Sequence, residues 1–258
     1  MASLIGAHAE RVARARELKE VKGRREHGRF TFEGPTLLEE ALRSGAAIEE
    51  LYVTESVYAN NARVRELDAG GTPVYLVDER TARKLSDLET PTGIVAVTPH
   101  RLAPLAAVLA GRFTLALADL NDPGNVGTLL RSAEAFGASG VVLGRLGVDP
   151  YNPKVVRGAM GSLFRLPIAL ASAEEFTAAA TPGSVLGLTA EGEDIASVPI
   201  GERAVLLVGH ERRGLGPWEA AAGRKTGIPM PGAAESLNAA IAGSIALYAL
   251  AGRLSREP

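Results

Sequence analysis

The chain has 258 residues, and 46% of them are apolar, which is enough for one large or two modest globular domains. A net charge of −2 and a pI near 6.1 argue against a protein that coats nucleic acid non-specifically, so any such contact is expected in a local patch. The absence of cysteine and the scattered positions of four histidines exclude disulfides and thiol nucleophiles, and they predict that no metal is bound.

The sequence also bears on the compartment. Its N-terminus has no apolar signal region, and no stretch reaches the roughly 20 apolar residues that span a bilayer. We expect a cytoplasmic protein without a membrane partner.

Residues 1–30 form the most basic segment, with eight Lys or Arg against four Glu. This excess makes the segment a candidate surface for nucleic-acid phosphates. An alternative interpretation is a solvated amphipathic helix, whose apolar face would consist of Val12, Ala15, Leu18 and Val21. The sequence does not separate the two.

Up to about residue 98, extended and helical patterns alternate, which predicts a small α/β domain over residues 1–98. The extended segments are Phe30–Glu33, Leu51–Thr54, Val74–Val77 and Ile94–Val97, and the helical ones are Pro35–Arg43, Asn61–Ala69 and Glu79–Leu85. Residues 99–112 contain two prolines, a glycine and an Ala/Leu stretch, which predicts a linker with a short helix.

A second α/β domain, with a mostly parallel sheet, is predicted over residues 113–258. Its expected strands are Thr114–Asp119, Gly140–Leu143, Val185–Leu188 and Ala204–Val208. One helix is expected from about Val126 to Gly137, with a buried stripe of Val126, Leu129, Leu130, Ala133 and Phe136. The last helix is expected from about Ser236 to Leu254, with Leu237, Ile241, Ile245 and Tyr248 on one face.

The first motif follows the first strand of this second domain and reads Asp-Pro-Gly-Asn-Val-Gly-Thr-Leu-Leu-Arg over residues 122–131. Asn125 is expected near the first turn of a helix, and Arg131 lies off the apolar stripe. By itself the segment is equally typical of an ordinary βα unit with a capping Asn and a solvated Arg.

Two further motifs lie downstream. Residues 206–215 carry a buried strand into a Gly-rich turn, which places Glu211 at the carboxyl end of the strand, where ligands of open α/β sheets bind. Residues 235–243 read Glu-Ser-Leu-Asn-Ala-Ala-Ile-Ala-Gly, so Ser236 is a candidate N-cap and Asn238 a first-turn residue. The small residues that follow allow close packing, and either segment alone could be structural.

Together, Asn-x-Gly-x-x-x-Arg, Gly-x-Glu-x-x-Gly and Ser-Leu-Asn, in this order, resemble the motifs of the SpoU (TrmH-type) RNA 2'-O-ribose methyltransferases of the SPOUT superfamily. Residues 29–42 resemble the start of the L30e-like α/β substrate-binding domain that many members carry, and residues 152–164 resemble a segment after the second strand of relatives. In one departure, His210 stands where relatives often have Asn.

The resemblance implies a C-terminal domain with a deep trefoil knot, S-adenosyl-L-methionine (AdoMet) as cofactor, a homodimer formed through the C-terminal domain, and methyl transfer to a ribose 2'-hydroxyl. It implies a catalytic Arg131, supported by Asn125, Glu211, Ser236 and Asn238. The implied cofactor-binding residues are Leu188, Thr189, Gly209, Ile228, Met230 and Leu237. Candidate RNA-binding residues are Arg24, Arg25, Arg29 and Arg157.

The extra N-terminal domain resembles those of relatives that modify ribosomal RNA, which favours rRNA, most of all 23S rRNA, as the RNA partner. A tRNA 2'-O-methyltransferase is the nearest alternative. A catalytically inactive RNA-binding or ribosome-assembly protein is the alternative of another class. Some relatives confer antibiotic resistance, but no residue of this sequence discriminates that role.

Overall fold

The computed structural model describes residues 2–233 and 236–254. The chain forms two compact units, one of Met1–His100 with Tyr151–Phe164 and one of Arg101–Pro150 with Arg165–Pro258. The sequence-based division placed the segment Tyr151–Phe164 in the second domain, whereas the structure groups it with the first unit.

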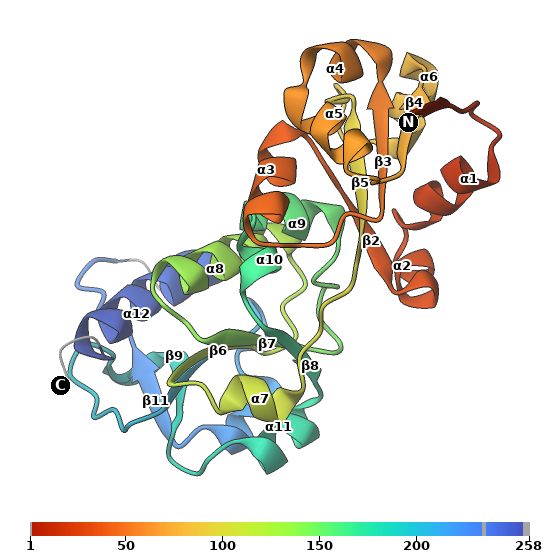
Figure 1. The fold of residues 1–258 in the computed structure, drawn as a ribbon. Helices are drawn as coiled ribbons and strands as arrows, with labels where there is room; N and C mark the ends of the chain where they lie inside the picture. The colour runs from red at the N-terminus through yellow and green to blue at the C-terminus, as the bar shows by residue number, and fades with distance from the viewer. Residues whose placement is uncertain (1, 234–235, 255–258) are drawn as a thin grey trace. The chain divides into compact units, whose positions relative to one another are not determined.

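The N-terminal unit is a five-stranded mixed sheet in the order β1-β4-β3-β5-β2 (Figure 1). Strand β5 is antiparallel to both of its neighbours, and the remaining pairs are parallel. The strands are β1 (Ser3–Leu4), β2 (Arg29–Glu33), β3 (Glu50–Thr54), β4 (Val74–Val77) and β5 (Ile94–Pro99). The helices are α1 (Glu10–Glu17), α2 (Val21–His27), α3 (Pro35–Arg43), α4 (Glu55–Asn60), α5 (Ala62–Ala69), α6 (Glu79–Leu85), α9 (Pro153–Ala159) and α10 (Ser162–Arg165), the last of which ends one residue into the second unit.

The basic N-terminal segment folds into α1 and α2 rather than one continuous helix. Val12, Ala15 and Leu18 are buried in the core of the unit, as the amphipathic interpretation predicts, but Val21 is exposed at the start of α2. The two helices approach so closely at Gly23 that an added Cβ would lie 2.1 Å from the carbonyl oxygen of Glu17. A side chain at this position would therefore push the helices apart.

Aromatic rings explain why the segment Tyr151–Phe164 belongs to the N-terminal unit. Tyr151 stacks on His100 with ring centroids 4.1 Å apart and contacts Phe30 at 4.5 Å. Phe164 meets the ring of Phe32 edge-on at 5.1 Å. Because these contacts bury large apolar surfaces, they hold both ends of the segment on β2 and its surroundings.

The second unit is built on a six-stranded sheet in the order β11-β9-β10-β6-β7-β8, with every neighbouring pair parallel. The four predicted strands are present, and two more, β8 and β11, extend the sheet at its edges. The strands are β6 (Phe113–Leu117), β7 (Gly140–Gly144), β8 (Ile168–Ala171), β9 (Val185–Asp194), β10 (Ala204–Val208) and β11 (Arg224–Gly227). The helices are α7 (Leu105–Leu109), α8 (Pro123–Ala135), α11 (Ala173–Ala179), the 3₁₀ helix η1 (Gly216–Ala221) and α12 (Ala239–Leu254).

Helices cover both faces of this sheet, α8 and α12 on one side and α7 and α11 on the other (Figure 1). Strand β10 is buried at every residue, as its uninterrupted apolar run predicts. In the described part of the chain no helix has the length and apolar character needed to cross a membrane. The trefoil knot stays a prediction.

Asp119 joins three segments around the end of β6. It has a left-handed φ of 51°, and its Oδ2 accepts a hydrogen bond from the indole Nε1 of buried Trp218 at 3.0 Å. Its Oδ1 accepts from the backbone N–H of Leu146 at 3.1 Å. The end of β7 approaches Asp119 so closely that it requires glycine at position 144, because an added Cβ there would lie 2.1 Å from Oδ1 of Asp119. The carboxylate thus ties η1 and the loop after β7 to the end of β6.

Replacing Asp119 with Asn tests this tie without adding backbone strain, because Asn also tolerates a left-handed φ. An amide has one acceptor oxygen, so it satisfies only one of the two donors. We expect Asp119→Asn to lower the free energy of unfolding by about 1–3 kcal/mol. Urea denaturation followed by the fluorescence of the single tryptophan measures it. An unchanged midpoint would contradict the assigned contacts.

Candidate active site

The candidate site lies at the carboxyl edge of the parallel sheet, where β9, β10 and β6 are neighbours. The loop after β6 carries the first motif, and the loop after β10 carries Glu211. Because parallel strands end at the same edge, segments far apart in sequence meet there.

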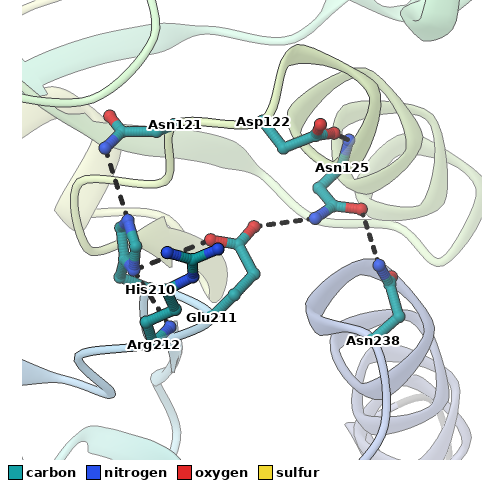
Figure 2. A pocket seen from close by; sticks show the side chains of 7 residues that line it. All are labelled: Asn121, Asp122, Asn125, His210, Glu211, Arg212 and Asn238. Atoms are coloured by element: carbon teal, nitrogen blue, oxygen red, sulfur yellow. Dashed lines mark hydrogen bonds and ion pairs between the residues drawn. The ribbon is translucent and has the colours of Figure 1, made fainter.

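A chain of amide groups connects the three motifs (Figure 2). The Nδ2 of Asn238 donates to Oδ1 of Asn125 at 3.1 Å, and Nδ2 of Asn125 donates to Oε1 of Glu211 at 2.7 Å. At the other end, Oδ1 of Asn238 accepts from the backbone N–H groups of Ala240 and Ile241 at 2.9 and 3.2 Å. A carboxylate only accepts and a helix N-terminus only donates, so both amides have a single consistent orientation.

Local capping places these amides. The side chain of Asp122 accepts from the N–H of Asn125 at 2.7 Å and caps α8, which begins at Pro123 and so holds Asn125 in its first turn. Helix α12 begins at Ala239, and the side chain of Asn238 accepts its first N–H groups. The prediction that Ser236 caps this helix is therefore wrong, because Ser236 lies three residues before its first residue.

The loop after β10 is a tight turn. Backbone hydrogen bonds link His210 and Gly214 in both directions, and a Cβ on Gly209 would lie 2.4 Å from the backbone of Gly214. The ring Nδ1 of His210 accepts from the N–H of Arg212 at 3.1 Å. In the neutral ring the proton is then on Nε2, which lies 3.3 Å from the amide of Asn121 and donates to it when the amide oxygen faces the ring. His210 thus stabilises the turn, and Glu211 still reaches Asn125.

Two adjoining cavities open at this edge. A polar one of about 600 Å³ is lined by Asn121, Asp122, Asn125, His210, Glu211, Arg212 and Asn238. A second one of about 520 Å³ brings together the six predicted cofactor-binding residues, Leu188, Thr189, Gly209, Ile228, Met230 and Leu237, and also Ser236. Both cavities share His210, Glu211, Arg212 and Asn238.

Sequence reasoning missed several residues that line these cavities. Ala190, Val208, Gly214, Ala239 and Ala242 line the second one. Each lies within four residues of a predicted site residue, so proximity to the motifs was the available signal. The same holds for Arg212, which follows Glu211 directly.

Arg131 does not line either cavity of its own chain. It lies exposed on α8, and its guanidinium makes no hydrogen bond or ion pair with any residue described in the structure. A catalytic role for Arg131 in this chain's own cavities has no geometric support.

One of the candidate RNA-binding residues requires correction. Arg24 is only 2% exposed, and its Nη1 donates to the carbonyl oxygens of Leu18 and Lys19 at 3.0 and 2.7 Å. It stabilises the turn between α1 and α2 and does not present a charge to RNA.

Of the other three candidate RNA-binding residues, two lie close to carboxylates and one has no ion pair among the described residues. Arg29 pairs with Glu49, and Nη1 of Arg157 lies 3.9 Å from Oε1 of Glu33. Arg25 is exposed and has no ion pair within the described ranges. Further cations of the basic segment are also paired, in Arg11–Glu50, Arg14–Glu10 and Lys19–Asp87. Four of the eight basic residues within residues 1–30 are therefore paired with carboxylates.

The chain is similar to known proteins in sequence and in fold. The profile of the SpoU rRNA Methylase family matches residues 112–248, and that of the MRM3-like substrate binding domain matches residues 9–96. The chain belongs to the SpoU rRNA methylase family. The 23S rRNA (guanosine(2553)-2'-O)-methyltransferase RlmP of Bacillus subtilis is 32% identical over 259 residues, which cover 98% of this chain and 100% of that protein.

Solved structures agree over the whole chain. The AdoMet-bound rRNA methyltransferase from Sinorhizobium meliloti is 32% identical, with a TM-score of 0.85 and coverage of 98% of both chains. The SpoU methyltransferase AviRb from Streptomyces viridochromogenes, in complex with AdoMet, is 27% identical, with a TM-score of 0.84 and coverage of 97% of this chain and 100% of that one. This family member is an AdoMet-dependent methyltransferase.

The second cavity fits that cofactor. Its volume lies within the range of small-molecule sites, and Leu188, Ile228 and Leu237 give it apolar walls for a ring system. The Oγ1 of Thr189 is buried there without a hydrogen-bond partner. Since an unsatisfied buried hydroxyl is costly, a polar group of the bound ligand would satisfy it. Among the described residues, no group of three or more His, Asp or Glu could hold a metal ion.

The amide chain predicts different effects of two changes at Asn238. Asn238→Asp keeps the cap, since a carboxylate accepts from helix N–H groups, but it removes the donor to Asn125. We expect it to melt near the wild-type temperature and to lose methyl transfer about tenfold or more, the cost of roughly one hydrogen bond to an aligned group. Asn238→Ala loses the cap as well and should be destabilised by about 1 kcal/mol. Thermal melting and initial rates test this, and full activity of Asn238→Asp would contradict it.

Proposed function

We propose that this protein methylates a ribose 2'-hydroxyl of ribosomal RNA, most specifically of 23S rRNA, with AdoMet as methyl donor. The observation that carries the proposal is the shared wall between the cofactor cavity and the polar cavity, which contains Glu211 and Asn238. Support for the RNA class comes from relatives such as RlmP and the 23S rRNA (adenosine(1067)-2'-O)-methyltransferase of Streptomyces laurentii, which is 32% identical and covered over 85% of its length.

Glu211 lies in this shared wall, where it can contact the ribose hydroxyl. AdoMet supplies an electrophilic methyl group on a sulfonium. The carboxylate of Glu211 uses Oε1 to accept from Asn125, and its Oε2 lies 3.7 Å from the unprotonated Nδ1 of His210. Oε2 can therefore accept a hydrogen bond from the ribose hydroxyl and orient its oxygen toward the cofactor cavity. As that oxygen bonds to the methyl carbon, the bond from sulfur to that carbon would break, the neutral thioether would leave, and Oε2 would take the hydroxyl proton. Full positioning of two reacting groups can supply about 7–11 kcal/mol of a reaction barrier, and this hydrogen bond would contribute to it.

Arg131 supports a second part of the proposal, a homodimer. Helix α12 leaves Ile241, Ile245 and Tyr248 between 41% and 67% exposed on one apolar face, and Leu237, two residues before the helix, is 37% exposed. Its small-residue side is already used within the chain, because a Cβ at Gly243 would lie 2.5 Å from Leu129 of α8. We propose that a second copy covers the exposed face and that Arg131 acts in the cavity of the partner subunit.

The substrate assignment is tested by transfer of radiolabelled methyl groups from AdoMet to purified 23S rRNA, 16S rRNA and bulk tRNA, followed by mass spectrometry of nucleosides. We expect a 2'-O-methylnucleoside in 23S rRNA alone. Methylated tRNA would replace this assignment with the tRNA alternative. AdoMet binding without transfer to RNA or ribosomal particles would favour the inactive RNA-binding alternative.

Mixed dimers test the position of Arg131. Arg131→Ala should abolish transfer and leave AdoMet affinity within about twofold, because Arg131 lies outside the cofactor cavity. If Arg131 acts in the partner, mixing Arg131→Ala with Glu211→Ala chains restores one working site in each mixed dimer. A random two-fold-symmetric mixture then regains about a quarter of wild-type activity.

The inactive homodimers of each variant are the controls, and light scattering measures the oligomeric state. No recovery after verified exchange of subunits would show that Arg131 does not act across the interface. A monomeric wild type would refute the dimer.

A further inference from the structure

One cation at the site remains without an assigned role. Arg212 is the sole Lys or Arg that lines either cavity within residues 2–233 and 236–254, and it lines both. Its side chain is exposed and makes no hydrogen bond or ion pair with any described residue. In Figure 2 it lies among the polar side chains of the site, beside His210 and Glu211.

The charges around Arg212 are mainly negative. Asp122 and Glu211 line the same polar cavity, and within the described residues neither carboxylate pairs with a Lys or Arg. Asp122 accepts from the backbone N–H of Asn125 and Glu211 from its side-chain amide, and Oε2 of Glu211 lies 3.7 Å from Nδ1 of His210. An RNA backbone entering this cavity meets two carboxylates, which repel its phosphates unless a cation is near. Arg212 is the cation that the chain places there.

The backbone of Arg212 is held before any ligand binds. Its N–H donates to Nδ1 of His210, and the turn is closed by the hydrogen bonds between His210 and Gly214. Only the outer part of the side chain loses freedom on binding, which limits the entropic cost. A guanidinium presents parallel N–H donors that match two oxygens of a phosphate.

We propose that Arg212 binds a phosphodiester of the RNA substrate beside the reacting ribose. This inference rests on the proposed function and adds the group that anchors its substrate. The carboxylate of AdoMet is the other anion within reach, since Arg212 also lines the cofactor cavity. The polar cavity favours the phosphate, because the apolar cofactor-binding residues do not line it.

The neighbouring Arg213 supplies a matched control. It is exposed, carries the same charge on the same turn and lines neither cavity. We expect Arg212→Ala to weaken binding of a 23S rRNA transcript about tenfold or more and to lower the slope of log affinity against log salt by about one. Arg213→Ala should change affinity by less than about threefold and leave the slope unchanged. Arg212→Lys keeps the charge but loses the paired N–H donors of the guanidinium, so its RNA affinity should lie between those of wild type and Arg212→Ala.

Filter binding across a salt series measures RNA affinity, and calorimetry measures AdoMet affinity, which Arg212→Ala should leave within about twofold. Equal losses of RNA affinity in Arg212→Ala and Arg213→Ala would overturn the proposal. They would indicate that the positive charge of this turn attracts RNA without a specific contact. A loss of AdoMet affinity with unchanged RNA binding would assign Arg212 to the cofactor carboxylate. Wild-type protein that methylates no RNA would instead refute the proposed function, whereas a fully active Arg212→Ala would refute only the role of Arg212.

Discussion

The site depends on the amide of Asn125, which binds two residues that lie 86 and 113 positions further along the chain, Glu211 and Asn238. Its two ends bind chemically different partners, a carboxylate at Glu211 and an amide donor at Asn238. Glu211 can only accept a hydrogen bond here, and the Nδ2 of Asn238 can only donate one. The amide of Asn125 therefore occupies Oε1 of Glu211 and leaves Oε2 available. One bridging side chain thereby converts three separate loops into one reaction geometry.

The fold makes this bridge possible through close backbone approach at two glycines. Gly209 lets the loop after β10 fold back on itself, so that Glu211 projects from a tight turn. Gly243 lets α12 lie against Leu129 of α8, and the hydroxyls of Ser132 and Ser244 meet at 2.7 Å across the same contact. Since Asn125 lies in the first turn of α8 and Asn238 directly before α12, the packing of α8 on α12 sets the separation of their amides.

Most of the strands and helices that periodicity predicted have their ends within one or two residues of the observed ones, because buried faces repeat regularly along an element, but it did not predict β1, α4, β8, α9, α10, α11, η1 or β11. It could not place Arg24, whose burial depends on carbonyl groups freed by the turn before α2. It also did not indicate that the apolar face of α12 containing Ile241 and Ile245 is exposed in the single chain. A periodic pattern shows that a face is apolar but not which element or subunit covers it. The site residues were found through a resemblance, and the amide chain joining them required coordinates.

Charge would link RNA binding to the proposed dimer. In a single chain, the polar cavity holds the carboxylates of Asp122 and Glu211 against the one guanidinium of Arg212, so it carries a net negative charge with His210 neutral. If Arg131 of the partner subunit enters this cavity, two guanidiniums offset two carboxylates, and an arriving phosphate is no longer repelled. The same contact that covers the apolar face of α12 would then also make the cavity receptive to RNA, which explains why a chain of net charge −2 can bind a polyanion at one place.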